Sequence, residues 1–388
     1  MFIRSISHLN LQNKKVFIRA DLNVPIDGST ISSTSRIDAS IPTIQYALSN
    51  AQVVILTSHL GRPEEGSYDS ALSLKPVVDY LEEKLNIKIM LHRDFEKGQS
   101  FGPGMLHVLE NVRFNFGEKK CSDELSVKYA SIADVFVMDA FGTAHRSEAS
   151  TYGIGKYIDE KCAGLLFYDE VDALTKTFNQ PKKPMLAIVG GSKVSTKLSV
   201  LKNLINHVDG LILGGGILNT FIAAQGFNIG KSLYEPDFVD EAKVILKEIK
   251  NRHIFFPTIE DVICAKEFNV KAHAEFKKID DVESNDMIFD LGPKTLKNIT
   301  DHLAKVSTIM WNGPLGVFEF EQFSTGTEAL SRAIADCDAF SLAGGGDTIA
   351  AIEKYKVCKK ISYISTAGGA FLEFAEGKKL PAIEMLEQ

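Results

Sequence analysis

Short apolar runs alternate with longer amphipathic segments along the chain. The runs are rich in Val, Ile, Leu and Phe, and some, such as 53–56 and 135–138, are apolar at every position. Uninterrupted apolar runs are typical of parallel strands that are buried on both faces. We therefore expect strands at 15–22, 52–58, 87–91, 105–110, 134–140, 185–190, 210–214, 254–258, 286–290, 307–311, 340–343 and 361–365.

The segments between these runs repeat apolar residues at helical spacing. They predict helices at 36–49, 75–86, 123–132, 196–207, 236–250, 294–305 and 325–335. Regular alternation of strand and helix indicates βαβ units. The fold class is therefore predicted as α/β, with doubly wound, Rossmann-like parallel sheets.

The segment 165–178 breaks this rhythm, because it is a long helical pattern that ends before Pro181 and Pro184. Five strand candidates precede it and seven follow. We interpret it as the connection between two α/β domains that face each other across a cleft. The expected division is a first domain at 1–164, an interdomain helix and hinge at 165–180, a second domain at 181–372, and a tail at 373–388 that packs back on the first domain.

Composition excludes several classes of protein. The 388 residues are 45% hydrophobic and 24% charged, which is typical of a globular chain and not of a disordered or fibrous one. A net charge of −7 argues against a nucleic-acid binder. The five cysteines are odd in number and widely spaced, as in a reducing compartment. With no apolar leader and no run long enough to cross a membrane, we expect a soluble cytoplasmic protein.

Arginine is concentrated in the first half of the sequence, which holds seven of the nine arginines within its first 146 residues. In open α/β sheets, ligands bind beyond the carboxyl ends of the strands. A guanidinium group suits carboxylate and phosphate. Single arginines are usually solvated surface charges, but this set lies near strand ends and helix starts and predicts a small, multiply anionic ligand. It comprises Arg19, Arg36, Arg62, Arg113 and Arg146, with His59 beside them.

Glycine takes the corresponding positions in the second half. Glycine-rich turns that follow a strand and open a helix let backbone N–H groups approach phosphate, although close strand–helix packing also requires glycine. Such turns are expected at 190–197, 214–216, 344–348 and 368–369. Lys193 and Lys197 would share a helix face if the first turn were formed. Asp347 is either a helix cap, which its position alone favours, or a magnesium contact.

Several familiar motifs are incomplete. The segment 226–232 is one residue too short for a P-loop, and 92–95 lacks the other parts of a protein-kinase site. Cysteine and histidine show no zinc spacing. A two-domain dehydrogenase is the alternative enzyme, but the first strand is not followed by a dinucleotide fingerprint. The residues themselves suggest phosphoryl transfer from a nucleotide to a small anion that they do not identify.

Nine short motifs occur in order over essentially the whole chain. They are 16–25 (VFIRADLNVP), 36–37 with 42–44, 58–63 (SHLGRP), 109–114, 139–146 (DAFGTAHR), 190–197 (GGSKVSTK), 214–221, 311–319 and 344–348. Together they resemble the phosphoglycerate kinase family. A non-catalytic binding protein on the same fold is the alternative, and it would be expected to have lost Arg36, Lys193, Lys197 or Asp347, all of which are present.

The resemblance implies a role for each matching residue. The ligands of 3-phosphoglycerate would be Asp21, Asn23, Arg36, His59, Arg62, Arg113 and Arg146. Arg36, Lys193 and Lys197 would be catalytic, facing the transferring phosphoryl group. Glu319 would bind the nucleotide ribose, and Lys197, Gly345, Gly346, Asp347 and Thr348 the ATP or ADP phosphates. Asp347 would hold Mg²⁺, while Arg19 is assigned a structural role.

The resemblance also implies how the reaction proceeds. The acceptor carboxylate is already ionised, so no general base is needed. The domains must close for direct transfer, with a hinge within 160–185 and a second crossing near 368–376. We expect a monomer. The chain departs from the family pattern in two places. In the closing loop, Ala367 would be strained if its position required a positive φ, and Phe371 replaces a serine. After Arg146, residues 147–150 (SEAS) stand where the family commonly has a different short polar run.

Overall fold

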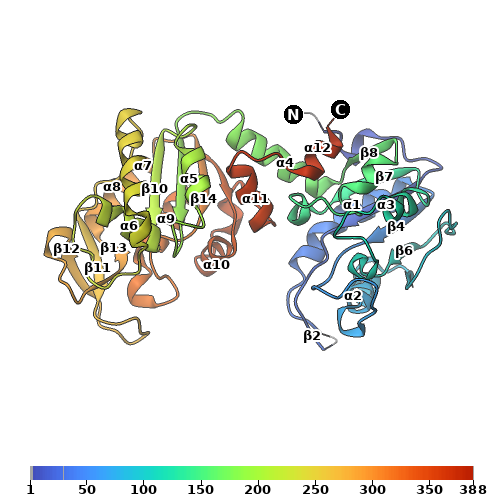
Figure 1. Cartoon of the computed structure of the whole chain (residues 1–388), viewed down its shortest axis with the longest axis horizontal. Coiled ribbons are helices and arrows are strands. Elements are labelled where there is room, and N and C mark those ends of the chain that lie inside the picture. The colour runs from blue at the N-terminus through green and yellow to red at the C-terminus, as the bar shows by residue number, and fades with distance from the viewer. Residues whose placement is uncertain (1–2, 29, 388) are drawn as a thin grey trace. The chain divides into compact units, whose positions relative to one another are not determined.

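The computed structural model describes residues 3–28 and 30–387, which form two compact units (Figure 1). The first unit comprises the chain up to Asp172 together with the segment from Lys379 onward. The second unit is Ala173–Lys378. The boundary at Asp172 falls inside helix α4 (Leu165–Phe178). The chain returns to the first unit through α12 (Pro381–Leu386), where the amide of Ala382 donates to the carbonyl of Ala144 at 3.1 Å.

The first unit is built on a six-stranded parallel sheet in the order β5-β6-β4-β1-β7-β8. The strands are β1 (Lys15–Ala20), β4 (Val53–Thr57), β5 (Ile89–His92), β6 (Leu106–Leu109), β7 (Val135–Asp139) and β8 (Glu160–Ala163). All five strands predicted in this half are confirmed. β8 was not predicted, because Glu160 and Lys161 interrupt its short apolar pattern.

Helices and short elements complete this unit. They are α1 (Ser35–Asn50), α2 (Lys75–Leu85), α3 (Asp123–Ala130), the hairpin strands β2 (Ile26–Asp27) and β3 (Thr30–Ile31), and the 3₁₀ turns η1 (Ile6–His8), η2 (Ser70–Leu72), η3 (Val112–Phe114), η4 (Phe141–Thr143) and η5 (Gly153–Lys156). The predicted helices at 36–49, 75–86 and 123–132 are therefore confirmed.

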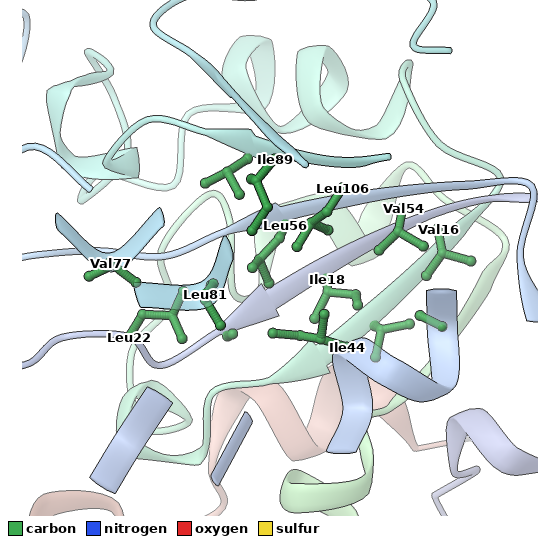
Figure 2. Packing of buried hydrophobic residues seen from close by; sticks show 14 of the residues in the cluster. Val16, Ile18, Leu22, Ile44, Val54, Leu56, Val77, Leu81, Ile89 and Leu106 are labelled. Atoms are coloured by element: carbon green, nitrogen blue, oxygen red, sulfur yellow. The ribbon is translucent and has the colours of Figure 1, made fainter. Parts of the chain in front are cut away.

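The core of the first unit explains why the central strands are continuously apolar. Ile18 on β1 is in register with Leu56 on β4 and with Val137 on β7, and all three side chains are fully buried. Figure 2 shows Ile44 from α1 and Leu81 from α2 packed beside these strands. Full burial of one such side chain contributes about 2 kcal/mol. This packing fixes the strand ends from which the loops described below emerge.

The second unit contains a five-stranded parallel sheet in the order β10-β9-β14-β15-β16. Its strands are β9 (Met185–Gly190), β10 (Gly210–Gly214), β14 (Thr308–Asn312), β15 (Phe340–Ala343) and β16 (Tyr363–Ile364). Its helices are α5 (Leu198–Leu204), α6 (Gly215–Ala224), α7 (Val239–Asn251), α8 (Pro293–Leu303), α9 (Thr325–Asp336), α10 (Gly346–Lys354) and α11 (Gly368–Ala375), with 3₁₀ turns η6 (Pro236–Phe238), η7 (Ile279–Asp281), η8 (Glu321–Phe323) and η9 (Cys358–Lys360).

One part of this unit differs from the prediction. A three-stranded antiparallel sheet, in the order β12-β11-β13, comprises β11 (Asp261–Ala265), β12 (Glu275–Lys278) and β13 (Met287–Leu291). The strand predicted at 254–258 is wrong, since that segment forms only an isolated bridge between Phe255 and Gly210. Pro257 lacks the N–H group that a ladder requires, and this explains the failure.

Two further findings concern membrane-spanning helices and disulfide bonds. No helix in the described part of the chain is both long and apolar enough to cross a bilayer. All five cysteines are free thiols.

Candidate active-site groups in the two units

The anion-binding candidates of the first unit follow four neighbouring parallel strands. β1 leads to Asp21 and Asn23, β4 to His59 and Arg62, and β6 and β7 to the loops that carry Arg113 and Arg146. Because the strands are parallel, these loops emerge at one edge of the sheet.

Arg36 lies beside the loop that follows β1. Its Nη1 donates to the carbonyl of Asn23 at 3.1 Å and lies 3.5 Å from Oδ2 of Asp21. The Asn23 side chain accepts a hydrogen bond from the amide of Gly61 at 2.9 Å. A cavity of about 590 Å³ is lined by Asn23, Arg36, Gly61 and Leu60, among others. Arg36 is 38% exposed, so its guanidinium group remains accessible to a ligand.

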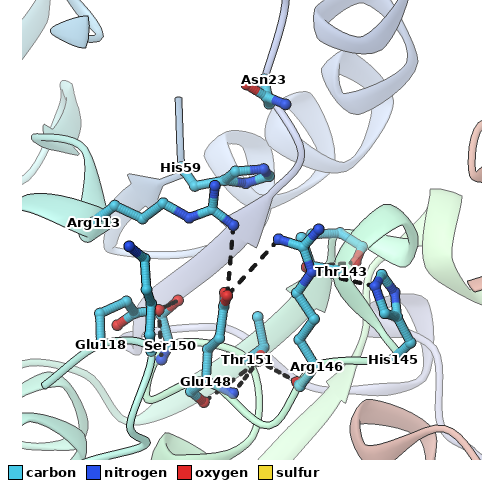
Figure 3. Close-up of polar contacts among 12 residues, drawn as sticks. Asn23, His59, Arg113, Glu118, Thr143, His145, Arg146, Glu148, Ser150 and Thr151 are labelled. Carbon is cyan, nitrogen blue, oxygen red and sulfur yellow. Dashed lines mark hydrogen bonds and ion pairs between the residues drawn. The ribbon is translucent and has the colours of Figure 1, made fainter. Parts of the chain in front are cut away.

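Arg113 and Arg146 converge on one carboxylate (Figure 3). Oε1 of Glu148 lies 3.5 Å from Nη2 of Arg113 and 3.8 Å from Nη1 of Arg146. Arg113 also donates to the carbonyl of Gly61. Its pKa is lowered, first because burial disfavours the charged form. From sequence, Glu148 is visible only as part of the 147–150 run that departs from the family pattern, and it was not assigned to this cluster.

His59 and Arg19 contact each other next to Arg113 and Arg146. The Arg19 side chain is completely buried, donates to the Ser150 hydroxyl at 2.9 Å, and places Nη2 3.3 Å from Nδ1 of His59. The pKa of His59 is well below its usual range, firstly because of burial and then because of the charges of Arg19, Arg113, Arg146 and Arg36. His59 is thus a neutral imidazole surrounded by cations. Arg62, by contrast, is exposed.

The lysines of the second unit are not placed as the sequence suggested. Residues 191–197 form a loop, and α5 begins only at Leu198, so Lys193 and Lys197 do not share a helix face. Lys193 is exposed. The Lys197 ammonium group donates to Oδ1 of Asn312, and burial lowers the pKa of Lys197 to about 8, with Asp347 opposing the shift. Asn312 was not assigned a role from sequence, although it stands in the 311–319 motif.

The 344–348 turn joins β15 to α10. Gly345 has a φ of +98°, and a Cβ there would lie 2.8 Å from Nδ2 of Asn312. The Thr348 hydroxyl accepts from the amide of Gly313 at 2.7 Å and donates to the carbonyl of Gly344 at 2.9 Å. It therefore fixes the turn, while Gly346 has open space around it.

Asp347 is exposed in the first turn of α10. The capping alternative is wrong, since the helix cap is Gly345 and, among the residues described, no side chain caps this end. Within 3–28 and 30–387, no three His, Cys, Asp or Glu residues are grouped as a protein-only metal site would require. A single accessible carboxylate beside the glycine-rich 344–348 turn does fit Mg²⁺, which usually keeps waters and phosphate oxygens as its other ligands.

An apolar slot of about 210 Å³ adjoins the turn between β10 and α6. Its walls include Gly215, Leu233, Phe268, Phe289 and Val317. Phe268 is 62% exposed, with its ring 5.0 Å from that of Phe320. This slot could not be predicted from sequence because its residues come from separate elements. In the sequence, Leu233 and Phe268 are only single apolar residues outside the predicted elements, and such residues are common on protein surfaces.

Ala367 and Phe371 cause no strain in the closing loop. Ala367 has a φ of −120°, in the extended region that any residue adopts, so the expected strain is absent at this position. Phe371 is fully buried on α11, and a Cβ on Gly344 would lie 3.0 Å from its ring. The phenyl group therefore packs beneath the 344–348 turn.

The fold is that of a two-unit α/β protein in which each unit contains a parallel sheet, and glycine-rich turns follow the strands of the second unit. The phosphoglycerate kinase family model matches residues 6–378. The phosphoglycerate kinase of Francisella philomiragia is 56% identical over 388 residues, covering all of this chain and 99% of the relative, and that of Vibrio campbellii is 54% identical over 387 residues with the same coverage. The chain belongs to the phosphoglycerate kinase family.

Solved structures agree with this assignment. The phosphoglycerate kinase of Coxiella burnetii has a TM-score of 0.96 and 50% identity, covering 99% of this chain and 98% of that one. The enzyme from Pyrococcus horikoshii has a TM-score of 0.79 and 32% identity, with 98% of both chains covered. The predicted fold class and the family resemblance are thus confirmed, and the dehydrogenase alternative is wrong.

Proposed function

We propose that this chain catalyses the reversible, magnesium-dependent transfer of a phosphoryl group between ATP and the carboxylate of 3-phosphoglycerate, giving 1,3-bisphosphoglycerate and ADP in glycolysis and gluconeogenesis. The observation that carries this proposal is the surroundings of His59, where the charges of Arg19, Arg36, Arg113 and Arg146 all act on one buried imidazole. Cations gathered in this way need a multiply anionic ligand.

In the first unit, 3-phosphoglycerate would be held by Asp21, Asn23, Arg36, His59, Arg62, Arg113 and Arg146. Neutral His59 would offer a hydrogen bond, and the arginines would bind the phosphate and carboxylate. Partly exposed Arg36 would face the transferring group. Glu148 already occupies one side of Arg113 and Arg146, so the ligand would bind their remaining N–H groups.

In the second unit, the nucleotide would lie across the glycine-rich turns. The apolar slot beside Gly215 and Phe268 suits a purine base, and Glu319 would bind the ribose. Backbone N–H groups of Gly345, Gly346, Asp347 and Thr348 at the start of α10 would bind the phosphates. Asp347 would hold Mg²⁺, which when bound supplies positive charge against the β- and γ-phosphates.

Transfer would be direct and in line. A carboxylate acceptor carries no proton to remove, so catalysis would consist of positioning and charge neutralisation by Arg36, Lys193 and Lys197. Because the two substrates bind to different units, the units must come together, with a hinge in 165–180 and a second crossing near 368–376. Closure would also exclude water from the phosphoryl group.

We further propose that the enzyme acts as a cytoplasmic monomer. Both sets of substrate-binding groups are contained in one chain, and the free cysteines suit a reducing compartment.

The proposal is tested by incubating the protein with ATP, Mg²⁺ and 3-phosphoglycerate and following 1,3-bisphosphoglycerate. We expect rapid product formation, loss of activity on chelation of Mg²⁺, and negligible ATP hydrolysis when 3-phosphoglycerate is omitted. Binding of both substrates without any product would contradict the proposal and would favour the non-catalytic alternative.

A further inference from the structure

Glu148 has no catalytic or binding role in the function proposed above, although its carboxylate lies between Arg113 and Arg146 (Figure 3). Its side chain is only 8% exposed. Oε1 is shared between Arg113 at 3.5 Å and Arg146 at 3.8 Å, and Oε2 is buried without a hydrogen-bond partner among the described residues. A buried carboxylate between two arginines needs a physical account.

The turn that carries Glu148 is fixed on both sides. The Thr151 hydroxyl accepts from the amide of Glu148 at 3.1 Å and donates to the carbonyl of Arg146 at 2.9 Å. The amide of Tyr152 donates to the carbonyl of Glu148 at 2.9 Å. Ser150 donates to Glu118 and accepts from Arg19. The backbone therefore holds the Glu148 carboxylate beside the two guanidinium groups.

The charges around Arg113 show what this carboxylate does. Burial lowers the pKa of Arg113, the charge of Glu148 opposes that shift, and the charges of Arg146 and Arg19 add to it. Glu148 thus offsets the mutual repulsion of neighbouring cations, of which Arg113 is buried and Arg146 is 35% exposed. Both of its contacts, at 3.5 and 3.8 Å, are long for charged hydrogen bonds, so Glu148 holds neither guanidinium group in a tight pair.

We propose that Glu148 is an internal counter-ion of the basic cluster, which limits how tightly Arg113 and Arg146 bind an anion. This inference rests on the proposed function, because the anion is taken to be 3-phosphoglycerate. A fixed negative charge next to the binding arginines reduces their attraction for substrate and product alike. The product can then leave a site that would otherwise hold it too strongly.

Two matched pairs of side chains test the proposal, namely Glu against Gln and Asp against Asn at position 148. We would measure the dissociation constants of 3-phosphoglycerate and of inorganic sulfate by titration calorimetry. Glu148→Gln keeps the size of the side chain and removes its charge, so both anions are expected to bind about tenfold more tightly. Turnover should fall as release slows. Glu148→Asp keeps the charge and should remain close to the wild type.

Glu83→Gln is the control, since it removes one charge from an exposed position on α2 and should leave both dissociation constants unchanged. A disturbed structure can only weaken binding, so tighter binding is specific to a counter-ion. Equal or weaker binding by Glu148→Gln would overturn the proposal. If Glu148→Gln does not fold, Glu148→Asn must bind both anions more tightly than Glu148→Asp does. The reverse order of affinities would overturn the proposal. Failure of the wild type to bind 3-phosphoglycerate would instead refute the proposed function.

Discussion

The ammonium group of Lys197 donates a hydrogen bond to Oδ1 of Asn312, whose Nδ2 in turn donates to the carbonyl of Gly344 at 2.7 Å. This chain of contacts connects the loop after β9, the end of β14 and the turn before α10. It holds the lysine beside the turn proposed to bind phosphates, where a positive charge acts most strongly on them.

The charge of Lys197 should make the reaction sensitive to alkaline pH. Burial lowers the pKa of Lys197 to about 8, so the ammonium form prevails below that pH and is lost above it. We expect kcat/KM for ATP to fall between about pH 7.5 and 9. Lys197→Arg stays charged throughout this range, so its lower activity should be nearly independent of pH. Identical profiles for the two proteins would show that Lys197 is not the titrating group.

Gly345 and Gly346 form a matched pair of adjacent positions. In Gly345→Ala, alanine would have to adopt a φ of +98°, and its Cβ would lie 2.8 Å from Nδ2 of Asn312. The substitution should therefore lower the free energy of unfolding by about 1–3 kcal/mol and raise the KM for ATP. Gly346→Ala points into open space, so stability should be unchanged while the KM for ATP rises. Urea unfolding and steady-state kinetics separate the two effects. An unaltered KM in Gly346→Ala would mean that the phosphates do not lie there.

The apolar slot predicts the behaviour of Phe268→Ala. Because Phe268 lines the slot and is 62% exposed, its removal should cost little stability but should raise the KM for ATP about tenfold, since aromatic packing on the base is lost. The KM for 3-phosphoglycerate should not change. Phe276→Ala removes another exposed phenyl group, which does not line the slot, and serves as the control. Equal effects of both variants would contradict the assignment of the slot.

Glu118 should make stability decrease as pH rises. Burial raises the pKa of this carboxyl from 4.5 to about 7 in the folded protein. Below about pH 4.5, Glu118 is protonated in both the folded and the unfolded protein. As pH rises from there through 7, the unfolded chain loses this proton more readily than the folded protein, so the contribution of Glu118 to stability is lost. The free energy of unfolding of the wild type, relative to Glu118→Gln, should thus fall by up to about 3 kcal/mol between pH 4.5 and 8. Urea unfolding measures both free energies. If the difference between the wild type and Glu118→Gln does not change with pH, this prediction is wrong.

Sequence alone predicted the parts of the fold that local pattern determines. β1, β4 and β7 are uninterrupted apolar runs, and the loops at their carboxyl ends carry Asp21, His59 and Arg146. In the antiparallel sheet, β13 matches the strand predicted at 286–290, whereas β11 and β12 were not predicted. β12 is a partly exposed, polar edge strand whose pairing with β11 comes from tertiary packing, and its own pattern does not show it.

The candidate sites were predictable only in part, for the same reason. Arginines and glycines are visible as residue types at strand ends, whereas the apolar slot brings together Leu233, Phe268 and Phe289 from distant segments. Glu148 is similar, because nothing in its sequence shows that it lies between Arg113 and Arg146. The helix predicted at 196–207 begins two residues late, at Leu198, because helical spacing continues into residues that form the turn before it.

The central claim of the proposed function is that substrates bound to separate units react only when the units come together. Small-angle X-ray scattering tests it most directly, with the free protein, each substrate alone, and an unreactive ATP analogue plus 3-phosphoglycerate. We predict a decrease in the radius of gyration only when both ligands are present. An unchanged radius with both ligands bound, in a protein that turns over at a normal rate, would contradict the claim.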